Sequence, residues 1–494
     1  MARGAGAGAG RDGEPVRRWG ARLTQAAAAA LLCLASLPSA AVPPGVAAAL
    51  TAAGVPLSAA GLYVADASGR VLLEHNAATA LNPASTMKLV TTAAALELLG
   101  PAATWRTEAH LLGRLSNGRL DGDLLLRGGG DPRLTLENLW LLLRDLRARG
   151  LRDIAGDLVI DRGAFAVADV DPAAFDGELT RPYNQGPDAL LLNFRAVRLT
   201  FIPDAGTRAV HILAEPPLPE LGIANELVLG DGPCDAWPER AEADLVTMTL
   251  RFKGSFALAC GERVRHYSLL PPLDYARALF DHLWRGVGGS FSGRARLGAT
   301  PPGSRPFAAF ESPTLLEVVR DTNKNSNNVM ARQLYLSLSA RHGTPATPEQ
   351  SRAAVDAWLA ARGLTMPEMV LENGAGLSRQ ERLSARGLGR LLAAFWNSPL
   401  GPELAASLPL AGVDGTLRRR FTSSPAAGRA HLKTGLLDQV RALAGYVHGE
   451  GGRTLVVVIL INHANAANAA PAQDALVEWA LSQANAVPRG PRVP

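Results

Sequence analysis

The fold of this chain is decided by the stretch Asn82-Pro83-Ala84-Ser85-Thr86-Met87-Lys88. From there to Leu99, apolar residues recur at helical spacing, and Gly100-Pro101 ends the pattern. Residues three apart share one face of a helix, so the sequence predicts that Ser85 and Lys88 lie about 5–6 Å apart at Cβ. A serine needs a nearby base to become a nucleophile, and a lysine whose pKa is lowered can be that base. Because S-x-x-K is common by chance, the interpretation depends on the rest of the chain.

Lysine is rare in this chain, which has 50 lysines and arginines together but only four lysines. They are Lys88, Lys253, Lys324 and Lys433. Arginine evidently serves as the ordinary surface cation, so a retained lysine is better explained by its own chemistry. Lys324 lies two residues before Ser326-Asn327-Asn328, and Lys433 opens Lys433-Thr434-Gly435. The ordered set S-x-x-K, S-x-N and K-T-G matches that of the active-site-serine penicillin-binding proteins and β-lactamases.

The composition indicates a globular, mildly basic protein with more than one domain. The chain has 494 residues, which exceeds one compact core, so two or three domains are expected. The hydrophobic fraction is 47% and the formal net charge is +5. Basic residues do not cluster with interleaved aromatic residues, so no nucleic-acid partner is expected. The sequence has neither H-E-x-x-H nor C-x-x-C, and we expect neither a metal nor a cofactor.

Residues 1–41 have the pattern of an export signal. Arg17, Arg18 and Arg22 supply the charged part before an apolar stretch from Ala26 to Leu37, which is too short to span a bilayer permanently. Small residues follow, and cleavage is expected after Ala40 or Ala41. We therefore predict a periplasmic protein. The alternative is an uncleaved anchor, which would keep the protein attached to the membrane.

Three cysteines are present, and one of them lies in the predicted signal. Leu32 precedes Cys33, where lipidation would need a small residue, so a lipoprotein is disfavoured. Cys234 and Cys260 remain in the mature chain and flank a strand-like segment. In an oxidising compartment a disulfide is the expected state, and it would add roughly 3 kcal/mol of stability. Two separate free thiols are the alternative.

The two ends of the mature chain predict one α/β unit. Before the serine, the pattern predicts a helix at 46–53 and strands at 59–66 and 71–74. After residue 290 it predicts helices at 328–338, 348–362, 385–396 and 470–484, strands at 432–436, 440–449 and 453–462, and a glycine-containing loop at 371–379. Strands that lead into a serine-bearing helix favour an α/β sandwich.

A long, mostly β insertion separates these two ends. Its sequence pattern predicts strands at 107–112, 119–127, 154–161, 190–203, 209–214, 226–229 and 245–253, and helices at 136–149 and 273–284. The phrase Gly122-Asp123-Leu124-Leu125-Leu126 recurs in kind at Gly156-Asp157-Leu158-Val159-Ile160, which we interpret as two similar strands. Ser85 and Ser326 are 241 positions apart, a gap that disfavours a compact β-lactamase.

These patterns divide the chain into four parts. Residues 1–41 form the signal peptide. Residues 42–105 together with 291–485 form a discontinuous catalytic domain. Residues 106–290 form an inserted β-rich region of two domains, and residues 486–494 form a C-terminal tail.

Three further phrases carry a family resemblance. They are Gly128-Gly129-Gly130-Asp131-Pro132, Asn373-Gly374-Ala375-Gly376-Leu377-Ser378-Arg379 and Leu410-Ala411-Gly412-Val413-Asp414-Gly415-Thr416-Leu417. With the three motifs, they make residues 42–485 similar to the D-alanyl-D-alanine carboxypeptidase/endopeptidase family, the low-molecular-mass class C penicillin-binding proteins. The resemblance implies a serine β-lactamase/penicillin-binding-protein-like transpeptidase domain with large, mostly β inserted domains. This sequence departs from the family at Asn373, where aspartate is usual, and at Leu436, where many relatives have Ser or Thr.

The resemblance implies how the reaction would proceed. Ser85 would attack the D-Ala carbonyl of a peptidoglycan stem peptide or of a D-Ala-diaminopimelate crosslink, and form an acyl-enzyme that water hydrolyses. Lys88 would accept the serine proton, although the identity of the base is disputed in such sites. Lys433 would favour neutral Lys88 by like-charge repulsion and would bind the terminal carboxylate. Ser326 would relay the proton to the leaving amine.

The remaining residues implied by the resemblance hold the substrate. Asn328 would position the base and the substrate amide, and Thr434 would help to bind the carboxylate. Gly435 belongs to the same K-T-G strand. The backbone N–H groups of Ser85 and Leu436 would form the oxyanion hole. β-Lactam antibiotics would inhibit the enzyme by acylating the same serine.

The resemblance also implies a pocket for the end of a diaminopimelate side chain. Glu178 and Tyr183 have the spacing of its acidic wall, and Arg379 would meet a carboxylate. The alternative for Glu178 is an ordinary solvated loop carboxylate. His431, beside the K-T-G strand, is expected to be structural or exposed.

Two other functions are weighed against a DD-peptidase. One is a β-lactamase or esterase on the same framework, which the long insertion disfavours. The other is a non-enzymatic wall-binding protein with a relict site, which the intact motif set disfavours.

Overall fold

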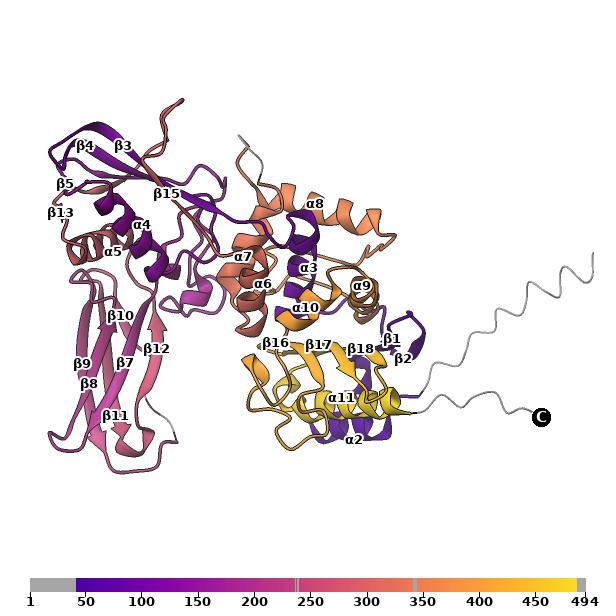
Figure 1. Cartoon of the computed structure of the whole chain (residues 1–494). Coiled ribbons are helices and arrows are strands. Elements are labelled where there is room, and N and C mark those ends of the chain that lie inside the picture. Colours follow the sequence, from indigo (N-terminus) through magenta and orange to yellow (C-terminus); the bar gives the residue numbers. More distant parts are fainter. Residues whose placement is uncertain (1–40, 236, 238–239, 341–343, 487–494) are drawn as a thin grey trace, which may run out of the picture. The chain divides into compact units, whose positions relative to one another are not determined.

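The computed structural model describes residues 41–486, except 236, 238–239 and 341–343 (Figure 1). The predicted signal peptide, apart from Ala41, and the tail from residue 487 lie outside the described residues. Within the described part of the chain, no helix is both long and apolar enough to span a membrane. The described residues from Val42 onward form one compact unit.

A five-stranded antiparallel sheet joins the two ends of the mature chain, and its strand order is β16-β17-β18-β1-β2 (Figure 1). The strands are β16 (Ala430–Leu437), β17 (Val440–His448), β18 (Thr454–Asn462), β1 (Ala60–Asp66) and β2 (Val71–His75). Val64 of β1 lies opposite Val457 of β18, so segments from opposite ends of the sequence are hydrogen-bonded neighbours. The strands predicted in these five places are confirmed.

Both faces of this sheet are buried, which explains the almost continuous apolar runs of β1 and β18. Alternate residues enter different clusters: Val456 packs with one set of helices and Val457 with another. One face is covered by α2 (Pro44–Ala52) and α11 (Ala470–Asn485). The other face packs against α9 (Ala385–Trp396).

Five more helices pack with α9 in one apolar cluster. They are α3 (Lys88–Leu98), α6 (Leu315–Lys324), α7 (Asn328–Ser337), α8 (Pro348–Ala361) and α10 (Gly401–Ser407). The helices predicted at 328–338, 348–362, 385–396 and 470–484 are confirmed to within one residue at each end. The sequence did not predict α10, because seven residues are too few to display a helical period.

Residues 106–161 and 290–311 build a seven-stranded sheet. Its strands are β3 (Arg106–Ser116), β4 (Arg119–Arg127), β5 (Asp153–Ile154), β6 (Leu158–Asp161), β13 (Ser290–Phe291), β14 (Ala295–Leu297) and β15 (Ala308–Glu311). Helices α4 (Leu136–Ala148) and α5 (Pro272–Gly286) bury their apolar faces in its core. The two similar phrases are parallel neighbours, with Leu124 opposite Leu158.

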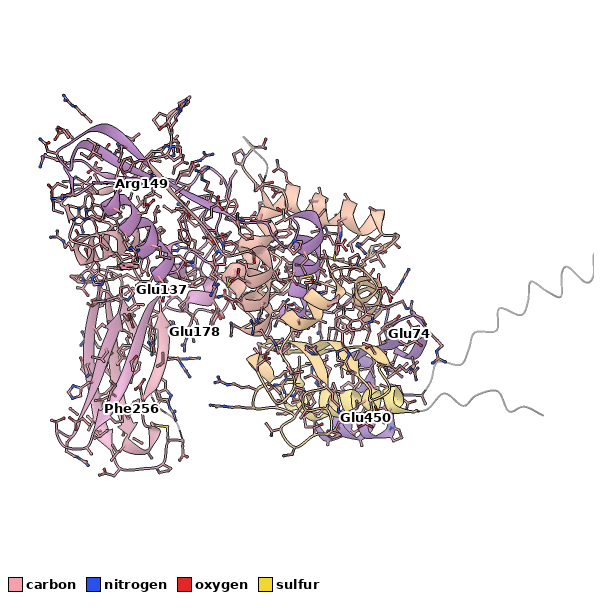
Figure 2. All side chains as sticks on the ribbon, in the orientation of Figure 1. Glu74, Glu137, Arg149, Glu178, Phe256 and Glu450 are labelled. Carbon is pink, nitrogen blue, oxygen red and sulfur yellow. A yellow bond between two sulfur atoms is a disulfide. The ribbon has the colours of Figure 1, made fainter. Side chains whose placement is uncertain are left out.

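Two three-stranded sheets lie between these segments in sequence, with orders β10-β11-β9 and β12-β7-β8. Their strands are β7 (Val197–Asp204), β8 (Ala209–Glu215), β9 (Gly222–Gly230), β10 (Glu242–Asp244), β11 (Thr249–Ala257) and β12 (Arg263–Tyr267). Aromatic rings fill the space between them: the ring centre of Phe201 lies 5.0 Å from that of Phe252 and 6.3 Å from that of Phe256. Figure 2 labels Phe256. Cys234 and Cys260 are joined in a disulfide.

Three strand predictions in the insertion are wrong in part. The strand predicted at 190–203 begins at Val197, because Leu192–Arg195 is a 3-10 turn in which Asn193 and Phe194 have positive φ. The strand predicted at 245–253 begins at Thr249, because Asp244 accepts backbone N–H groups that fold the preceding residues into a turn. The strand predicted at 154–161 is two short strands, β5 and β6.

Candidate active site

Ser85 lies on a 3-10 turn, Ala84–Met87, that leads directly into α3. This differs from the continuous α-helix that the sequence predicts. Asn82 fixes the turn, because its Oδ1 accepts the Ala84 N–H and its amide donates to the Ser378 carbonyl. Ala84 has φ +45, and a Cβ on Gly376 would fall 1.9 Å from the Ala84 carbonyl oxygen. The loop around Gly376 therefore presses against the serine turn, which only glycine permits.

Lys88 is fully buried beneath this turn. Its Nζ lies 2.9 Å from Ser85 Oγ and donates to Asn328 Oδ1 at 2.7 Å and to the Ala375 carbonyl. Burial, reinforced by the charge of Lys433, holds the pKa of Lys88 well below its usual range. Two N–H bonds of a neutral amine are thus used by Asn328 and Ala375, and its lone pair is left for the Ser85 hydroxyl. This is the geometry of a nucleophile with its base.

The Ser326-Asn327-Asn328 turn joins α6 to α7 and supplies two side chains to the site. Asn327 is the N-cap of α7, and its side chain accepts the Met330 N–H. The flanking residues are thereby free to contact other groups: Asn328 contacts Lys88, and Ser326 Oγ accepts from Lys433 Nζ at 2.7 Å. Ser326 has φ +54, a strained backbone conformation of the kind that clusters at functional sites.

Lys433 is the second fully buried lysine of the site. Besides Ser326, its Nζ donates to the Thr434 carbonyl at 2.8 Å. Burial lowers the pKa of Lys433 to about 7. Its strand β16 is an edge of the five-stranded sheet, and a Cβ on Gly435 would lie 2.8 Å from the Pro83 carbonyl oxygen. The glycine of K-T-G therefore lets β16 approach the serine turn.

Thr434 faces a hydroxyl partner that the sequence analysis did not identify. Its Oγ1 lies 3.0 Å from Oγ1 of Thr416, which is exposed. The turn that carries Thr416 is held by Asp414, whose carboxylate accepts from Lys324 Nζ at 2.6 Å and from the Leu410 N–H. The phrase that contains Thr416 was recognised, but nothing in the sequence places it beside Thr434. Leu436, where relatives often have a hydroxyl, is 60% exposed.

A cavity of about 610 Å³ is lined in part by the glycine-containing loop, whose Ser378 carbonyl accepts from Asn82, the residue that fixes the serine turn. Its lining includes Asp171, Phe175, Tyr335, Ser378 and Arg379. The Arg379 guanidinium stands 4.8 Å from the centre of the Phe175 ring. Glu349, Glu372 and Arg332 also line it, so the cavity offers acidic groups, basic groups and apolar walls.

The structure places only one of the three predicted pocket residues at this cavity, namely Arg379. Among the described residues that line it, neither Glu178 nor Tyr183 is present. Glu178 lies 2.9 Å from Arg240 and 3.6 Å from Arg181, and Figure 2 marks its position. Tyr183 donates its hydroxyl to Asp176 at 3.0 Å. Asp171 and Phe175 are far from Arg379 in sequence, and only the folded chain brings them to the same cavity.

His431 lies on the same strand as Lys433 but takes no part in these contacts. It is half-buried, and its ring stands 5.3 Å from that of His448. Burial lowers the pKa of His431. The prediction of a structural role for it remains a prediction.

Solved structures of known proteins share this fold. The crystal structure of penicillin-binding protein 4 (dacB) from Haemophilus influenzae superposes with a TM-score of 0.70 at 25% identity, over 85% of this chain and 93% of that chain. A predatory endopeptidase, Bd3459 from Bdellovibrio bacteriovorus, superposes with a TM-score of 0.51 at 16% identity, which shows the fold alone. The chain thus has the penicillin-binding-protein fold, with additional sheets inserted between its first and second motifs.

Sequence comparison identifies the family. The model of the D-Ala-D-Ala carboxypeptidase 3 (S13) family matches residues 45–483, so this chain belongs to that family and is a D-Ala-D-Ala carboxypeptidase, a hydrolase. The D-alanyl-D-alanine carboxypeptidase of Actinomadura sp. (strain R39) is 28% identical over 463 residues, covering 88% of this chain and 83% of the relative. D-alanyl-D-alanine carboxypeptidase DacB of Haemophilus influenzae is 25% identical over 399 residues, covering 80% and 83%.

Proposed function

We propose that this protein is a serine DD-peptidase that cleaves peptidoglycan stem peptides through an acyl-enzyme on Ser85. The observation that carries the proposal is the burial of Lys88, whose remaining contacts direct its lone pair at the Ser85 hydroxyl. In the acylation step, Ser85 Oγ bonds to the D-Ala carbonyl carbon and its proton passes to Lys88. The C–N bond to the leaving residue then breaks, and Ser326, whose Oγ is held by Lys433, relays the proton from Lys88 to the departing amine. Lys88 is thereby neutral again before the second step.

Water completes the cycle by attacking the ester of the acyl-enzyme. Lys88 accepts a proton from that water, and Ser85 leaves as the regenerated hydroxyl. The backbone N–H groups of Ser85 and Leu436 stabilise the oxyanion in both steps, and loss of one such donor costs about 2.7–4 kcal/mol of barrier. Asn328 holds the amine of Lys88 and orients the substrate amide.

The terminal carboxylate of the substrate binds at the K-T-G strand. Lys433 supplies the positive charge there, and the paired hydroxyls of Thr434 and Thr416 donate hydrogen bonds. Thr416 thus provides the second hydroxyl that is absent at Leu436.

The adjacent cavity receives the side chain of the residue before the D-alanines. Diaminopimelate ends in an ammonium and a carboxylate on one carbon, and the cavity presents Asp171 and Arg379. These opposite charges favour diaminopimelate over a side chain with a single ammonium. The same cavity supports endopeptidase action on D-Ala-diaminopimelate crosslinks, which resemble the D-Ala-D-Ala bond.

The proposal includes export to the periplasm, where the substrate is found, and inhibition by β-lactams. Inhibition by β-lactams is supported by the crystal structure of penicillin-binding protein 4 from Haemophilus influenzae complexed with a β-lactam. The disulfide between Cys234 and Cys260 supports export to the periplasm, because disulfides persist in oxidising compartments.

The test is the release of D-alanine from two synthetic pentapeptides that differ only in diaminopimelate or lysine at position three. We expect release from both, with a higher kcat/KM for diaminopimelate, and no release with Ser85→Ala. Arg379→Gln should reduce the preference between the peptides while preserving turnover of the lysine peptide. Absence of release from either peptide by the wild-type protein would contradict the proposal.

A further inference from the structure

Glu381 is a buried carboxyl group near the active site to which no role has yet been given. It lies at the end of the glycine-containing loop and is fully buried. Its Oε1 accepts two backbone N–H groups, from Glu372 at 3.2 Å and from Asn373 at 3.0 Å. Its Oε2 is buried and has no hydrogen-bond partner among the described residues. Such a carboxyl costs free energy to bury, so a role for it in the site would explain its presence.

The loop connects this carboxyl to Lys88 through a short series of hydrogen bonds. Glu381 holds the Asn373 backbone, and the Asn373 side chain accepts the Ala375 N–H at 2.9 Å and donates to the Leu377 carbonyl at 2.9 Å. An amide can do both, whereas a carboxylate only accepts. The Ala375 carbonyl in turn accepts from Lys88 Nζ. Glu381 therefore fixes the peptide that orients the amine of Lys88.

Charge couples the same two groups. Charged side chains from three elements interact electrostatically with Glu381: Lys88 of α3, Arg332 of α7 and Glu372 of the loop. Lys433 of β16 acts on Lys88 from another side. Burial raises the pKa of Glu381 to about 7, and the negative charge of Glu381 opposes the lowering of the pKa of Lys88.

We propose that Glu381 is a positioning residue of the base. It fixes the loop that presents the Ala375 carbonyl to Lys88, and its charge sets the fraction of Lys88 that is unprotonated. When Glu381 holds a proton, it no longer stabilises the charged form of Lys88, and a larger fraction of Lys88 is neutral and able to accept the proton of Ser85. When Glu381 is ionised, the protonated form of Lys88 is stabilised and acylation is slowed. The proposal concerns the state of Lys88 within the proposed acylation mechanism and rests on it.

The rarity of lysine makes a direct test practical. With ¹³C-labelled lysine, the Cε signals of only four side chains need to be resolved, and Lys88→Met assigns the signal of Lys88. The titration of this signal is followed from pH 4 to 11 in the wild-type protein and in Glu381→Gln, Glu381→Asp and Glu403→Gln. Glu403, on α10, also has a buried carboxylate oxygen without a hydrogen-bond partner among the described residues, and it is not part of the site.

We expect the midpoint of Lys88 to fall by about half a pH unit or more in Glu381→Gln, because a neutral amide cannot stabilise the charged amine. Glu381→Asp retains the charge and should keep the midpoint near that of the wild type, even if acylation slows. Glu403→Gln should leave it unchanged. The acidic limb of acylation by benzylpenicillin should move in the same direction as the midpoint.

An unchanged midpoint in Glu381→Gln would overturn the proposal, whatever the acylation rate. An equal shift in Glu381→Gln and Glu381→Asp would also overturn it, because a general distortion of the loop would then be the cause. The titration does not require turnover. If benzylpenicillin failed to acylate the wild-type protein, the proposed function would be contradicted. The titration of Lys88 would still decide whether Glu381 acts on Lys88.

Discussion

Around Ser85 the molecule buries ionisable groups, whereas its two three-stranded sheets bury aromatic rings. Lys88, Lys433 and Glu381 are all 0% exposed, as is Phe252 between the sheets. Removing a charge from water costs several kcal/mol, while burying a phenyl ring contributes roughly 1.5–3 kcal/mol. The same degree of burial therefore has opposite effects on stability in the two regions.

The difference shows what each region's burial provides. In the two three-stranded sheets, the packed rings stabilise a part of the insertion that contains none of the three motifs. In the site, burial lowers the pKa of both lysines, which favours the neutral amine that the proposed base requires. The remaining lysines, Lys253 and Lys324, lie beside carboxylates at 2.9 and 2.6 Å and serve as ordinary ion-pair partners. Substitutions in the site should therefore impair activity while preserving or raising stability, and substitutions in the sheets should do the reverse.

The largest effect is expected from Lys88→Met. Loss of the base should reduce kcat/KM for D-Ala-D-Ala peptides by about 10²–10⁴-fold, while the free energy of unfolding stays the same or rises. Steady-state kinetics and urea unfolding measure the two quantities. Lys253→Met, an exposed lysine on β11, is the matched control and should leave both nearly unchanged. Equal activity in the two variants would remove the distinction between the regions.

In the sheets, Phe252→Ala should reduce stability by about 3–5 kcal/mol, because it leaves a cavity beside Phe201 and Tyr267. Urea unfolding measures the loss. Val228→Ala, on the exposed strand β9, should change stability by less than about 0.5 kcal/mol. The fraction of Phe252→Ala that remains folded should retain wild-type kcat. A large fall in kcat per folded molecule would show that the sheets support the chemistry directly.

Lys433→Met should stabilise the protein at neutral and acidic pH by about 2–4 kcal/mol, while abolishing carboxylate binding. The pKa of Lys433 is about 7 in the folded protein and about 10.5 when unfolded. Between these values the unfolded state binds more protons, so wild-type stability rises with pH there. The advantage of the variant is therefore greatest below pH 7 and declines toward pH 10. Urea unfolding at pH 6 and pH 10 measures the difference in the free energy of unfolding between the variant and the wild type. A difference that grows with pH would contradict burial of a neutral Lys433.

The smallest effect concerns the paired hydroxyls. Thr416→Val should raise KM for D-Ala-D-Ala peptides by about 5–10-fold through loss of one hydrogen bond, without affecting stability. The double variant Thr416→Val/Leu436→Thr should recover part of the loss, because it restores a second hydroxyl beside Thr434. A peptide with an amidated C-terminus is the control, since it lacks the carboxylate and should not distinguish the variants. A fall in kcat with unchanged KM would argue against a binding role.

Local patterns predicted much of the fold, and the motif residues that the sequence singled out do meet in space. Both ends of β4 and of α9 were predicted to the residue, and α9 has the regular apolar face of an amphipathic helix. Ser85 and Lys88 are close in sequence, so their contact follows from helical geometry alone. Ser326, Asn328 and Lys433 required the ordered motif set, since no local signal brings β16 beside α7.

The residues that were missed depend on tertiary contacts. Glu381 looks like any charged loop residue, and only the folded loop shows that it is buried. Thr416 meets Thr434 because the Lys324–Asp414 pair bends the intervening turn. Spacing singled out Glu178, yet its carboxylate is paired with arginines, and Asp171 lines the cavity instead.

The central claim is that Ser85 forms an acyl-enzyme. Its most direct test is the intact mass of the protein after exposure to benzylpenicillin, measured beside Ser85→Ala. We predict a lasting mass increase of one penicillin in the wild type and none in the variant. Consumption of penicillin without a lasting adduct would indicate a β-lactamase, and an adduct that persists in Ser85→Ala, or no reaction at all, would contradict the assignment of Ser85.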